Sequence, residues 1–395
     1  MQRDLDQAHA RSRPAFSATS MQTLIFVITE DWFFASHFLP MLRAAREAGY
    51  EPAVICRVRA HRAAIEAEGA RVIPFEWDRG RREFGQAFAT IRGLTRILRE
   101  ERSAIVHLIA LWPIVLGGIA ARFAGARRRV HAVTGLGFLG ASNSGMARAS
   151  RLAARVLLRG PLGGGKTRFL LENPDDARLL GFDAENDPRI VIVGGAGVDP
   201  KHYSPSPMPP MPPLKIAIVA RMLWSKGIDL AVEAVRRARA EGAAVELSLY
   251  GEPDATNPKA FSRDTLESWS SEPGITWHGR TSDVASVWRA HHVCCLPSRG
   301  GEGLPRTLLE GASCGRAILT SDVPGCRALV RDGIEGILVP PDNARALSRA
   351  MVDLASDAAR VERLGEAGRR RVLAGFTDRH VVEAVAALYR EMGTD

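Results

Sequence analysis

The sequence SRGGEGLPRTLLEGASCGRAILTSDVPGCR, residues 298–327, decides how the rest of the chain is interpreted. A glycine-rich loop ends at Glu302-Gly303, and the run RTLLEGASCG after Leu304-Pro305 has the composition of a helix. Proline is tolerated near a first helical turn because its missing N–H would have no intrahelical partner. A helix N-terminus carries free N–H groups and a partial positive charge, which favour phosphates and other anions. The stretch therefore predicts an anion-binding loop followed by a helix.

Two carboxylates, Glu302 and Glu310, frame this motif with seven residues between them. If one helix carries both, they face the same side about 12 Å apart, at a rise of ~1.5 Å per residue. A nucleotide-sugar spans such a gap, with one carboxylate at a sugar hydroxyl, the other at a ribose and the phosphates over the helix end. An isolated pair at this spacing would be interpreted as two solvated glutamates. The surrounding glycine and proline pattern favours the ligand-binding interpretation.

The length and charge of the chain indicate two domains and an anionic partner. A chain of 395 residues is too long for one ordinary core, and 46% apolar and 25% charged residues are typical of a globular protein. Residues 1–205 hold 29 Lys/Arg and 20 Asp/Glu, whereas residues 206–395 hold 24 of each, so the net charge of +9 lies in the first half. This asymmetry indicates lipid headgroups, nucleic acid or a phosphorylated substrate.

The cysteines indicate the redox state of the protein's compartment, and the N-terminal residues are considered with them. The five cysteines show no CxxC or Cys/His ligand spacing, which argues against a disulfide framework and a structural zinc site. We therefore expect a reducing cytosol and no metal. Residues 1–20 have no apolar core segment and are predicted to be a disordered extension.

Apolar strands alternate with helical segments along the chain, beginning with MQTLIFVIT at residues 21–29. This alternation predicts the α/β class, with two Rossmann-like, doubly wound parallel-sheet domains facing each other across a cleft. We predict an N-terminal, acceptor-binding domain at 21–203 and a C-terminal, nucleotide-sugar-binding domain at 214–376. The proline-rich SPSPMPPMPP at 204–213 is the linker, and 377–395 is a helix expected to pack back on the first domain.

Two segments imitate other motifs. Residues 103–121 carry no formal charge and are long enough to cross a bilayer, but His107, Pro113 and two glycines interrupt them, so a buried strand and helix are predicted instead. Residues 160–167, GPLGGGKT, satisfy the phosphate-loop pattern letter for letter. That loop must leave a strand and open a helix. Here a helix precedes it and a strand follows, which predicts an ordinary connecting loop.

A pair of cations follows the first strand of the second half. Arg221 comes directly after KIAIVA, and Lys226 follows five residues later. Two cations at a strand tip suit a diphosphate, since arginine offers a planar fork and lysine a point charge. Neutralising a diphosphate leaving group is a plausible main source of catalysis.

The chain resembles the retaining GT-B glycosyltransferases of family 4 over nearly its whole length after residue 21. Within the family it is most similar to bacterial enzymes that extend lipid-linked oligosaccharides. The segments that carry the resemblance are TEDWFFASHFLP (29–40), VTGLG (133–137), GAGVDPKHYSP (195–205), LYGEPDATNP (249–258), RTSDV (280–284) and EGLPRTLLE (302–310) with DVPGCR.

The resemblance implies a role for each motif residue. Glu302 would contact donor-sugar hydroxyls, Glu310 the ribose, and the backbone of Gly303, Leu304 and Pro305 the sugar and phosphate. Arg221 and Lys226 would hold the diphosphate and act in catalysis, and Gly251, Gly279 and Arg280 would lie at the nucleotide. The family retains anomeric configuration and needs no metal or other cofactor besides the UDP-sugar donor.

Two histidines are expected to line the cleft. His37 is the stronger catalytic candidate and His107 the weaker, and a hydrogen-bonded structural role is the alternative for each. Many family members carry a histidine near the reacting centre where this chain has Thr134-Gly135, so that histidine has no counterpart at position 134.

Arg148, Arg151, Arg155 and Arg159 recur at three- and four-residue steps, which places them on one helical face. Basic residues near an anionic membrane contribute roughly 1 kcal/mol each. We therefore expect the first half to dock peripherally on the cytoplasmic leaflet; a solvated helix face is the alternative.

The sequence thus predicts a glycosyltransferase that moves a sugar, a hexose or N-acetylhexosamine, from a UDP-sugar to a lipid-linked or polysaccharide acceptor. A non-hydrolysing UDP-N-acetylglucosamine epimerase on the same fold is the first alternative. A noncatalytic nucleic-acid-binding protein is the second, and the absence of an RNA-binding motif argues against it.

Overall fold

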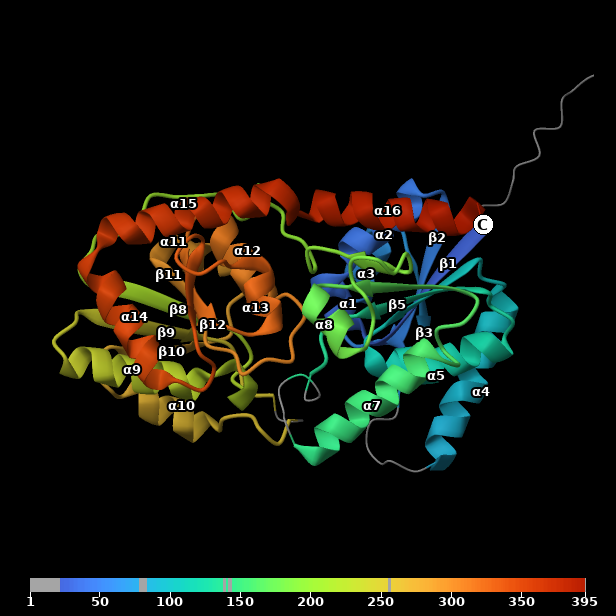
Figure 1. The fold of residues 1–395 in the computed structure, drawn as a ribbon, viewed down its shortest axis with the longest axis horizontal. Helices are drawn as coiled ribbons and strands as arrows, with labels where there is room; N and C mark the ends of the chain where they lie inside the picture. Colours follow the sequence, from blue (N-terminus) through green and yellow to red (C-terminus); the bar gives the residue numbers. More distant parts are fainter. Residues whose placement is uncertain (1–21, 78–83, 138–139, 141–143, 255–256, 395) are drawn as a thin grey trace, which may run out of the picture.

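The computed structural model describes residues 22–77, 84–137, 140, 144–254 and 257–394, which form two α/β halves side by side (Figure 1). The extension predicted at residues 1–20 lies outside the described residues. Each half is built on its own parallel sheet, and the polar loops at the carboxyl ends of the strands meet between the halves.

The first sheet has seven parallel strands in the order β3-β2-β1-β4-β5-β6-β7. The central strand β1 is buried continuously from Leu24 to Glu30, because helices cover both faces of the sheet. The strands are β1 (Gln22–Glu30), β2 (Tyr50–Arg57), β3 (Arg71–Pro74), β4 (Ile105–Ile109), β5 (Arg128–Val133), β6 (Lys166–Leu171) and β7 (Ile190–Ile192). The helices are α1 (Asp31–His37), α2 (Leu39–Glu47), α3 (Arg62–Ala67), α4 (Phe84–Glu101), α5 (Leu111–Phe123), α7 (Gly145–Arg159) and α8 (Pro174–Leu179).

The second sheet has six parallel strands in the order β10-β9-β8-β11-β12-β13. These are β8 (Leu214–Val219), β9 (Val245–Tyr250), β10 (Ile275–Gly279), β11 (Val293–Leu296), β12 (Ala317–Ser321) and β13 (Gly336–Val339). Its helices are the 3-10 turn η1 (Trp224–Lys226), α9 (Ile228–Ala240), α10 (Arg263–Ser270), α11 (Val284–Ala290), α12 (Arg306–Ser313), α13 (Pro324–Leu329), α14 (Ala344–Ser356) and α15 (Ala358–Gly375).

Each sheet has a separate apolar cluster on either face. The strand order moves outward in both directions from β1 in the first sheet and from β8 in the second, which is the doubly wound arrangement. The prediction of two Rossmann-like, doubly wound parallel sheets is therefore confirmed.

The two segments that imitate a membrane span and a phosphate loop have the structures that the sequence predicts. The uncharged residues 103–121 form β4 and most of α5. No helix among the described residues is long and apolar enough to cross a membrane. Residues 160–167 connect the end of α7 to the start of β6, the reverse of the strand-to-helix order that a phosphate loop requires.

The last helix, α16 (Asp378–Thr394), leaves the second half and packs on α2 of the first half (Figure 1). Its apolar face, which includes Val381, Val385 and Tyr389, completes the first sheet's core beside Phe26. Thr377, just before the helix, pairs with Val198 of the connecting segment between the halves. The fold of the first half therefore includes the end of the chain.

Two helix boundaries in the first half have local causes. The segment after β1 forms two helices, α1 and α2, separated at Phe38. Pro40 lies in the first turn of α2, where its missing N–H is tolerated, whereas it would interrupt a helix continued from α1. Helix α3 begins only at Arg62, after the backbone amides of Arg59 and His61 have donated hydrogen bonds to the Asp31 carboxylate.

Removing the Tyr389 hydroxyl is expected to destabilise the first half. The hydroxyl lies 2.6 Å from Nδ1 of His107, and both side chains have no exposed surface. Burial lowers the pKa of His107 to about 3, so the ring is neutral and depends on this hydrogen bond. Tyr389→Phe should lower the free energy of unfolding in urea by about 1–3 kcal/mol.

Tyr50→Phe is the matched control, because its hydroxyl makes only a long 3.4 Å hydrogen bond to the Tyr389 carbonyl. An equal loss of stability in the two variants would contradict the importance of the Tyr389–His107 hydrogen bond.

Candidate functional site

The glycine-rich motif lies at the carboxyl edge of the second sheet, between β11 and α12. The helix begins at Arg306 with Pro305 as its N-cap, so Glu302 lies on the loop and not on the helix. The expectation that one helix carries both Glu302 and Glu310 is therefore wrong. Gly300 and Gly301 have φ of 102° and 83°, a left-handed conformation that ends any helical path before Pro305.

The loop brings Glu302 to Lys226, the predicted cation at the end of η1. Lys226 Nζ forms an ion pair with one carboxylate oxygen of Glu302, and Ser298 Oγ donates to the other at 2.9 Å. The side chains of Lys226 and Glu302 are 18% and 23% exposed, so both reach the solvent between the halves. Two functional groups predicted from separate motifs thus meet at one point.

Arg299 holds the Lys226–Glu302 pair in place, although the sequence analysis did not single out this arginine. Its guanidinium is 5% exposed and forms ion pairs with Asp229 at 2.8 Å and Asp342 at 2.5 Å. It also lies 4.3 Å from the Trp224 ring centroid, and its backbone N–H donates to the Ser225 carbonyl. The glycine loop and η1 are consequently held together next to Lys226 and Glu302.

Arg221, the other predicted diphosphate ligand, follows β8 and forms a 2.8 Å ion pair with Asp254. Half of its side chain is exposed. The partner Asp254 belongs to the segment after β9 that also carries Gly251. Arg221 therefore lies at the carboxyl edge of the second sheet, held in a pair that a diphosphate would have to replace.

Glu310 lies on the second turn of α12 and is buried. One of its oxygens accepts a 3.0 Å hydrogen bond from the Tyr203 hydroxyl and lies 2.8 Å from Nε of Arg306. Burial raises the pKa of the Glu310 carboxyl, and the Arg306 cation opposes that rise. Arg306 also donates to the Ser36 carbonyl of the first half. Glu310 is therefore covered by Arg306 in this structure.

The nucleotide-edge residues Gly251 and Gly279 lie on neighbouring strand ends. The Gly251 N–H donates to the Gly279 carbonyl at 2.7 Å, and the Trp277 indole donates to the Gly251 carbonyl at 2.8 Å. Arg280, directly after, is exposed. Tyr250 and His278 stack with ring centroids 4.5 Å apart. This edge thus has a hydrogen-bonded backbone with the exposed Arg280 cation beside it.

His37 ends α1 and reaches toward the second half, whereas His107 does not. Burial lowers the pKa of His37 to about 4, with Arg306, Lys226 and Arg221 contributing, so the ring is neutral among three cations. Its Nδ1 lies 2.6 Å from Ser36 Oγ. The expectation that His107 lines the cleft is wrong, because His107 is fully buried in β4 against α16.

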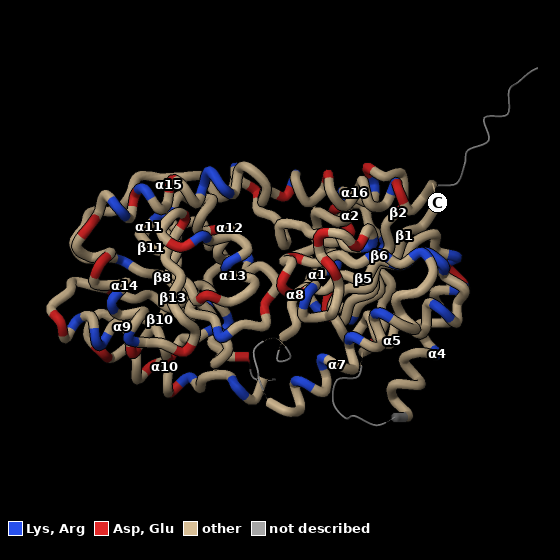
Figure 2. Tube along the Cα trace, in the orientation of Figure 1, with Lys and Arg blue, Asp and Glu red and all other residues tan. Residues whose placement is uncertain are grey.

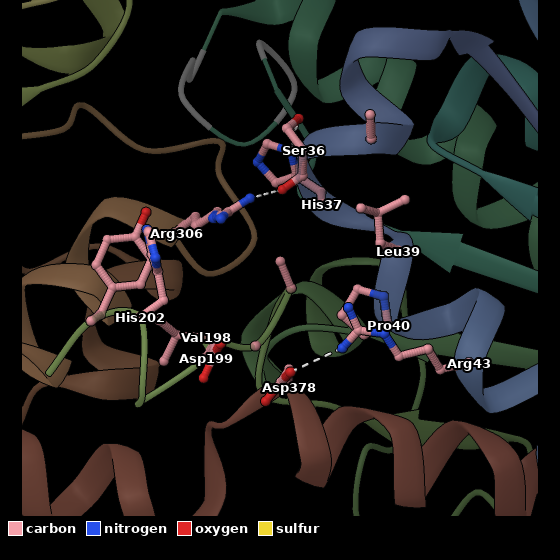
Figure 3. Close-up of a pocket in the computed structure, with 14 residues that line it drawn as sticks. Ser36, His37, Leu39, Pro40, Arg43, Val198, Asp199, His202, Arg306 and Asp378 are labelled. Atoms are coloured by element: carbon pink, nitrogen blue, oxygen red, sulfur yellow. Dashed lines mark hydrogen bonds and ion pairs between the residues drawn. The ribbon is translucent and has the colours of Figure 1, made fainter. Parts of the chain in front are cut away.

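A cavity of about 240 Å³ opens between the halves beside His37 (Figure 3). Figure 3 shows Arg306 reaching Ser36 across its edge and Asp378 reaching Arg43. The cavity is lined by residues of α1, α2, the connecting segment, α12 and α16: Ala35, Ser36, His37, Leu39, Pro40, Arg43, Ala196, Gly197, Val198, Asp199, His202, Tyr203, Arg306 and Asp378. It mixes cations, carboxylates and a neutral histidine, which suits a polar ligand.

The two halves meet closely at the glycine loop. The Gly137 N–H donates to the Gly301 carbonyl at 2.6 Å, and Glu172 of the first half accepts from the Leu304 N–H at 2.6 Å. A Cβ on Gly135 would lie 2.4 Å from the Gly303 nitrogen. The predicted sugar-binding backbone is therefore closed against the first half.

The site lies at the carboxyl ends of two facing parallel sheets, with cations and carboxylates converging at a helix N-terminus. Comparison with known proteins defines its class. Residues 213–357 match the family described as Glycosyl transferases group 1, and residues 23–160 match the family described as Glycosyl transferase 4-like. The chain is a glycosyltransferase of the GT-B type. It belongs to the group whose first half is of the 4-like family and whose second half is of group 1.

Relatives support this assignment over most of the chain. The N,N'-diacetylbacillosaminyl-diphospho-undecaprenol alpha-1,3-N-acetylgalactosaminyltransferase of Campylobacter jejuni is 23% identical over 81% of this chain and 86% of its own length. The UDP-Gal:alpha-D-GlcNAc-diphosphoundecaprenol alpha-1,3-galactosyltransferase of Escherichia coli is 24% identical over 76% and 78%. The solved structure of Anabaena Alr3699/HepE in complex with UDP-glucose superposes with a TM-score of 0.73 at 14% identity, covering 93% of this chain and 99% of that one.

Sequence reasoning missed four side chains that contact the predicted ones or hold them in place: Glu172, Tyr203, Arg299 and Arg306. Glu172 carried a usable signal, because a carboxylate directly after a buried parallel strand lies at the binding edge. Tyr203 and Arg306 have no such signal. No group of three or more His, Cys, Asp or Glu side chains within the described ranges is arranged to hold a metal ion.

Replacing Gly303 is expected to separate the two halves at the glycine loop. A Cβ at this position would lie 2.0 Å from Glu172 Oε2 and 3.1 Å from the Thr134 carbonyl carbon. Gly303→Ala should therefore break the Glu172–Leu304 hydrogen bond and raise the radius of gyration measured by small-angle X-ray scattering. Gly145→Ala, where a Cβ meets nothing, is the control. An unchanged scattering curve for Gly303→Ala would contradict this closure in solution.

Proposed function

We propose that the chain transfers a hexose or N-acetylhexosamine from a UDP-sugar to a lipid-linked or polysaccharide acceptor, with retention of anomeric configuration, in surface glycan assembly. The observation that carries the proposal is the Lys226–Glu302 pair at the N-terminus of α12, with Arg221 on the same edge of the sheet. The named relatives act on undecaprenyl-diphosphate-linked sugars, and one uses UDP-Gal. Both matching families are glycosyltransferases, which favours transfer over epimerisation.

The geometry assigns each charged group a task in this reaction. The diphosphate binds Arg221 and Lys226, which stabilise the negative charge that develops as the bond from the anomeric carbon to the leaving oxygen breaks. Glu302, released from Lys226, accepts hydrogen bonds from donor-sugar hydroxyls. Glu310 accepts them from the ribose once Arg306 has turned away. The UDP leaves with the bonding electron pair, and the acceptor oxygen takes its place.

The donor can be tested without knowing the acceptor, by following UDP release from a panel of UDP-sugars in water. We expect slow hydrolysis of one donor. Arg221→Ala should reduce the rate by about 10²–10³-fold, because a charge-stabilising group at the leaving diphosphate is lost. Glu302→Ala should abolish the preference for that sugar.

Arg236→Ala is the control for these variants, since Arg236 on α9 forms exposed ion pairs with Glu233 and Glu272 and lies outside the proposed donor site. Retention of full hydrolysis by both Arg221→Ala and Glu302→Ala, or failure of wild type to bind any UDP-sugar, would disprove the proposed donor site.

We also propose that α7 rests on the cytoplasmic leaflet of an anionic membrane. Figure 2 shows basic residues along this helix. Met146, Leu152 and Val156 are 73%, 61% and 61% exposed, and Arg155 and Arg159 are exposed next to them. An apolar strip beside a basic strip is typical of an interfacial helix. The five cysteines are all free and buried, which supports a reducing compartment.

This position would bring a lipid-linked acceptor to the site. Gly140, which precedes α7, lies against the glycine loop, since a Cβ on it would lie 2.9 Å from the Gly301 Cα. A sugar held at the headgroup level beside α7 would therefore be close to the donor loop, while the second half stays in the aqueous phase.

Vesicle flotation tests the docking. Wild type should float with phosphatidylglycerol vesicles at low salt and be released by salt, because screening weakens attraction to exposed charges. Leu152→Ser with Val156→Ser, and separately Arg155→Gln with Arg159→Gln, should each reduce the bound fraction several-fold. Arg96→Gln on α4 removes an exposed arginine elsewhere in the first half and serves as the control. Equal flotation of all variants would contradict docking through α7.

A further inference from the structure

Two tryptophans, Trp32 and Trp112, are exposed at the edge of the first sheet that faces the glycine loop. Trp32 lies in the first turn of α1, just after β1, and Trp112 lies in the first turn of α5, just after β4. Their exposed fractions are 40% and 50%, whereas the other five tryptophans, all within the described ranges, are buried or half-buried. Neither is part of the apolar clusters that the described residues form on the first sheet. Packing of the core therefore does not account for this tryptophan pair.

The register of the strands brings the tryptophan pair to one place. Strands β1 and β4 are neighbours in the sheet, and Val27 pairs with Leu108. Trp32 follows Val27 by five residues, and Trp112 follows Leu108 by four. Neighbouring strands lie about 4.8 Å apart. The two tryptophans therefore begin adjacent helices at the same carboxyl edge of the sheet.

This edge is the one that meets the second half. The loop after β5 contacts the glycine loop through Gly137 and Gly301, and α1 contacts α12 through the Ser36 carbonyl and Arg306. Because β4 lies between β1 and β5 in the sheet, Trp112 begins its helix between these two contacts. The tryptophan pair thus belongs to the first half and lies at the edge opposite the proposed donor groups.

The backbone just before Trp112 is strained. Ala110 has φ of 71° and ψ of 158°, a combination that residues with a Cβ rarely adopt. Its N–H donates to the Ala132 carbonyl at 2.9 Å, and its own carbonyl accepts from the Ile114 N–H at 3.0 Å. Strained backbone of this kind clusters at ligand sites, and here it sets the direction in which α5 and Trp112 leave the sheet.

Polar groups suited to hydroxyls lie at the next strand end. Arg57, the last residue of β2, forms a 3.2 Å ion pair with Glu30, which precedes Trp32 by two residues. The Arg57 Nε also lies 3.1 Å from the carboxylate of Glu76, which is exposed. A guanidinium and two carboxylates offer hydrogen-bond donors and acceptors in fixed orientations. The edge thus combines apolar rings with planar polar groups.

We propose that the tryptophan pair is a platform on which the acceptor sugar stacks, an inference that rests on the proposed function above. A pyranose ring presents C–H groups on its faces and hydroxyls around its rim. The negative face of an indole ring attracts such C–H groups, while the rim hydroxyls stay available to polar side chains. A lipid-linked or polysaccharide acceptor offers this chemistry at its terminal sugar, and the platform holds that sugar opposite the donor loop.

A lipid surface fits the tryptophan pair less well than a sugar does. Indole rings also anchor proteins at the headgroup level of membranes. The exposed apolar side chains of α7, which include Leu152 and Val156, already form a strip for such a contact. The tryptophan pair instead lies at the edge that meets the second half, with the Arg57–Glu30 ion pair at the neighbouring strand end.

Acceptor kinetics in the absence of a membrane test the platform. The probes are N-acetylglucosaminyl, N-acetylgalactosaminyl, glucosyl and galactosyl diphosphate esters of octanol, each combined with the UDP-sugar that wild type hydrolyses. At least one probe should accelerate UDP release by wild type above the rate in water. Trp32→Ala and Trp112→Ala should each raise KM for that probe about tenfold or more, because stacking is lost. KM for the donor and its hydrolysis in water should stay unchanged, since the donor groups belong to the other half.

Three comparisons separate stacking from other causes. Trp112→Phe keeps an aromatic face and should retain most of the acceptor affinity. Phe123→Ala is the matched control, because it removes an exposed ring from the other end of α5, about 16 Å along the axis at a rise of ~1.5 Å per residue. Butyl esters of the same sugar diphosphates should show the same loss as the octyl esters, because the sugar and not the chain is stacked.

An unchanged KM for the acceptor probe in both alanine variants would overturn the platform, even if those variants bound vesicles more weakly. A loss confined to the octyl esters would assign the rings to the lipid chain, and a parallel loss of donor hydrolysis would mark them as structural; either result contradicts the proposal. So does a wild type that hydrolyses a UDP-sugar but is accelerated by no probe. A wild type that neither binds nor hydrolyses any UDP-sugar disproves the proposed function itself, and the platform with it.

Discussion

The site depends on the close approach of two backbones, which brings the glycine loop of the second half against the loop after β5 of the first. The Gly137 N–H reaches the Gly301 carbonyl at 2.6 Å, and a Cβ on Gly301 would lie 2.0 Å from the Gly137 carbonyl oxygen. Only residues without a side chain can pack this way. The same constraint places Glu172 next to Leu304 and so brings chemistry from both halves to one point.

The C-terminal end of the chain holds the two halves in this close approach from the far side of the molecule. The segment at Thr377 pairs with Val198, and α16 then fills the apolar face of the first sheet. Arg43 on α2 reaches both Glu68 and Asp378, which ties the start of α16 to the first half. Because α15 and α16 follow each other along the chain, one of the two crossings between the halves lies at Gly375–Thr377, where helix α15 ends.

The sequence was sufficient for the sheets because their strands are buried on both faces and read as continuous apolar runs. Met21–Thr29 and KIAIVA are examples, and the structure places them at β1 and β8. The local spacing of the two motifs led to Lys226 and Glu302, which meet at the loop, whereas Arg221 and Glu310 have other partners. The start of α12 was not predictable from composition, because a proline is tolerated inside a first helical turn, whereas Pro305 here has an extended backbone as the N-cap and the helix begins only at Arg306. Glu172 and Tyr203 were missed because their partners, Leu304 and Glu310, lie more than a hundred residues away in the sequence. Arg306 was missed because its contacts depend on the rotamer of its side chain.

The ligand-binding groups of this structure are satisfied by one another. Lys226 holds Glu302, Arg306 covers Glu310, and Arg221 holds Asp254. Glu310 is the most buried of these groups, and a buried charge without a partner is costly, whereas the half-exposed Arg221 gains little from its pair. A nucleotide-sugar brings both the anion that the cations require and the hydroxyls that the carboxylates require, so it can replace these pairs together. A free phosphate or a neutral sugar would replace only one side and leave the other charge unpaired. Under the proposed function, specificity for a donor with both parts would follow from the pairing itself, before any contact with the base or the sugar's individual hydroxyls is considered.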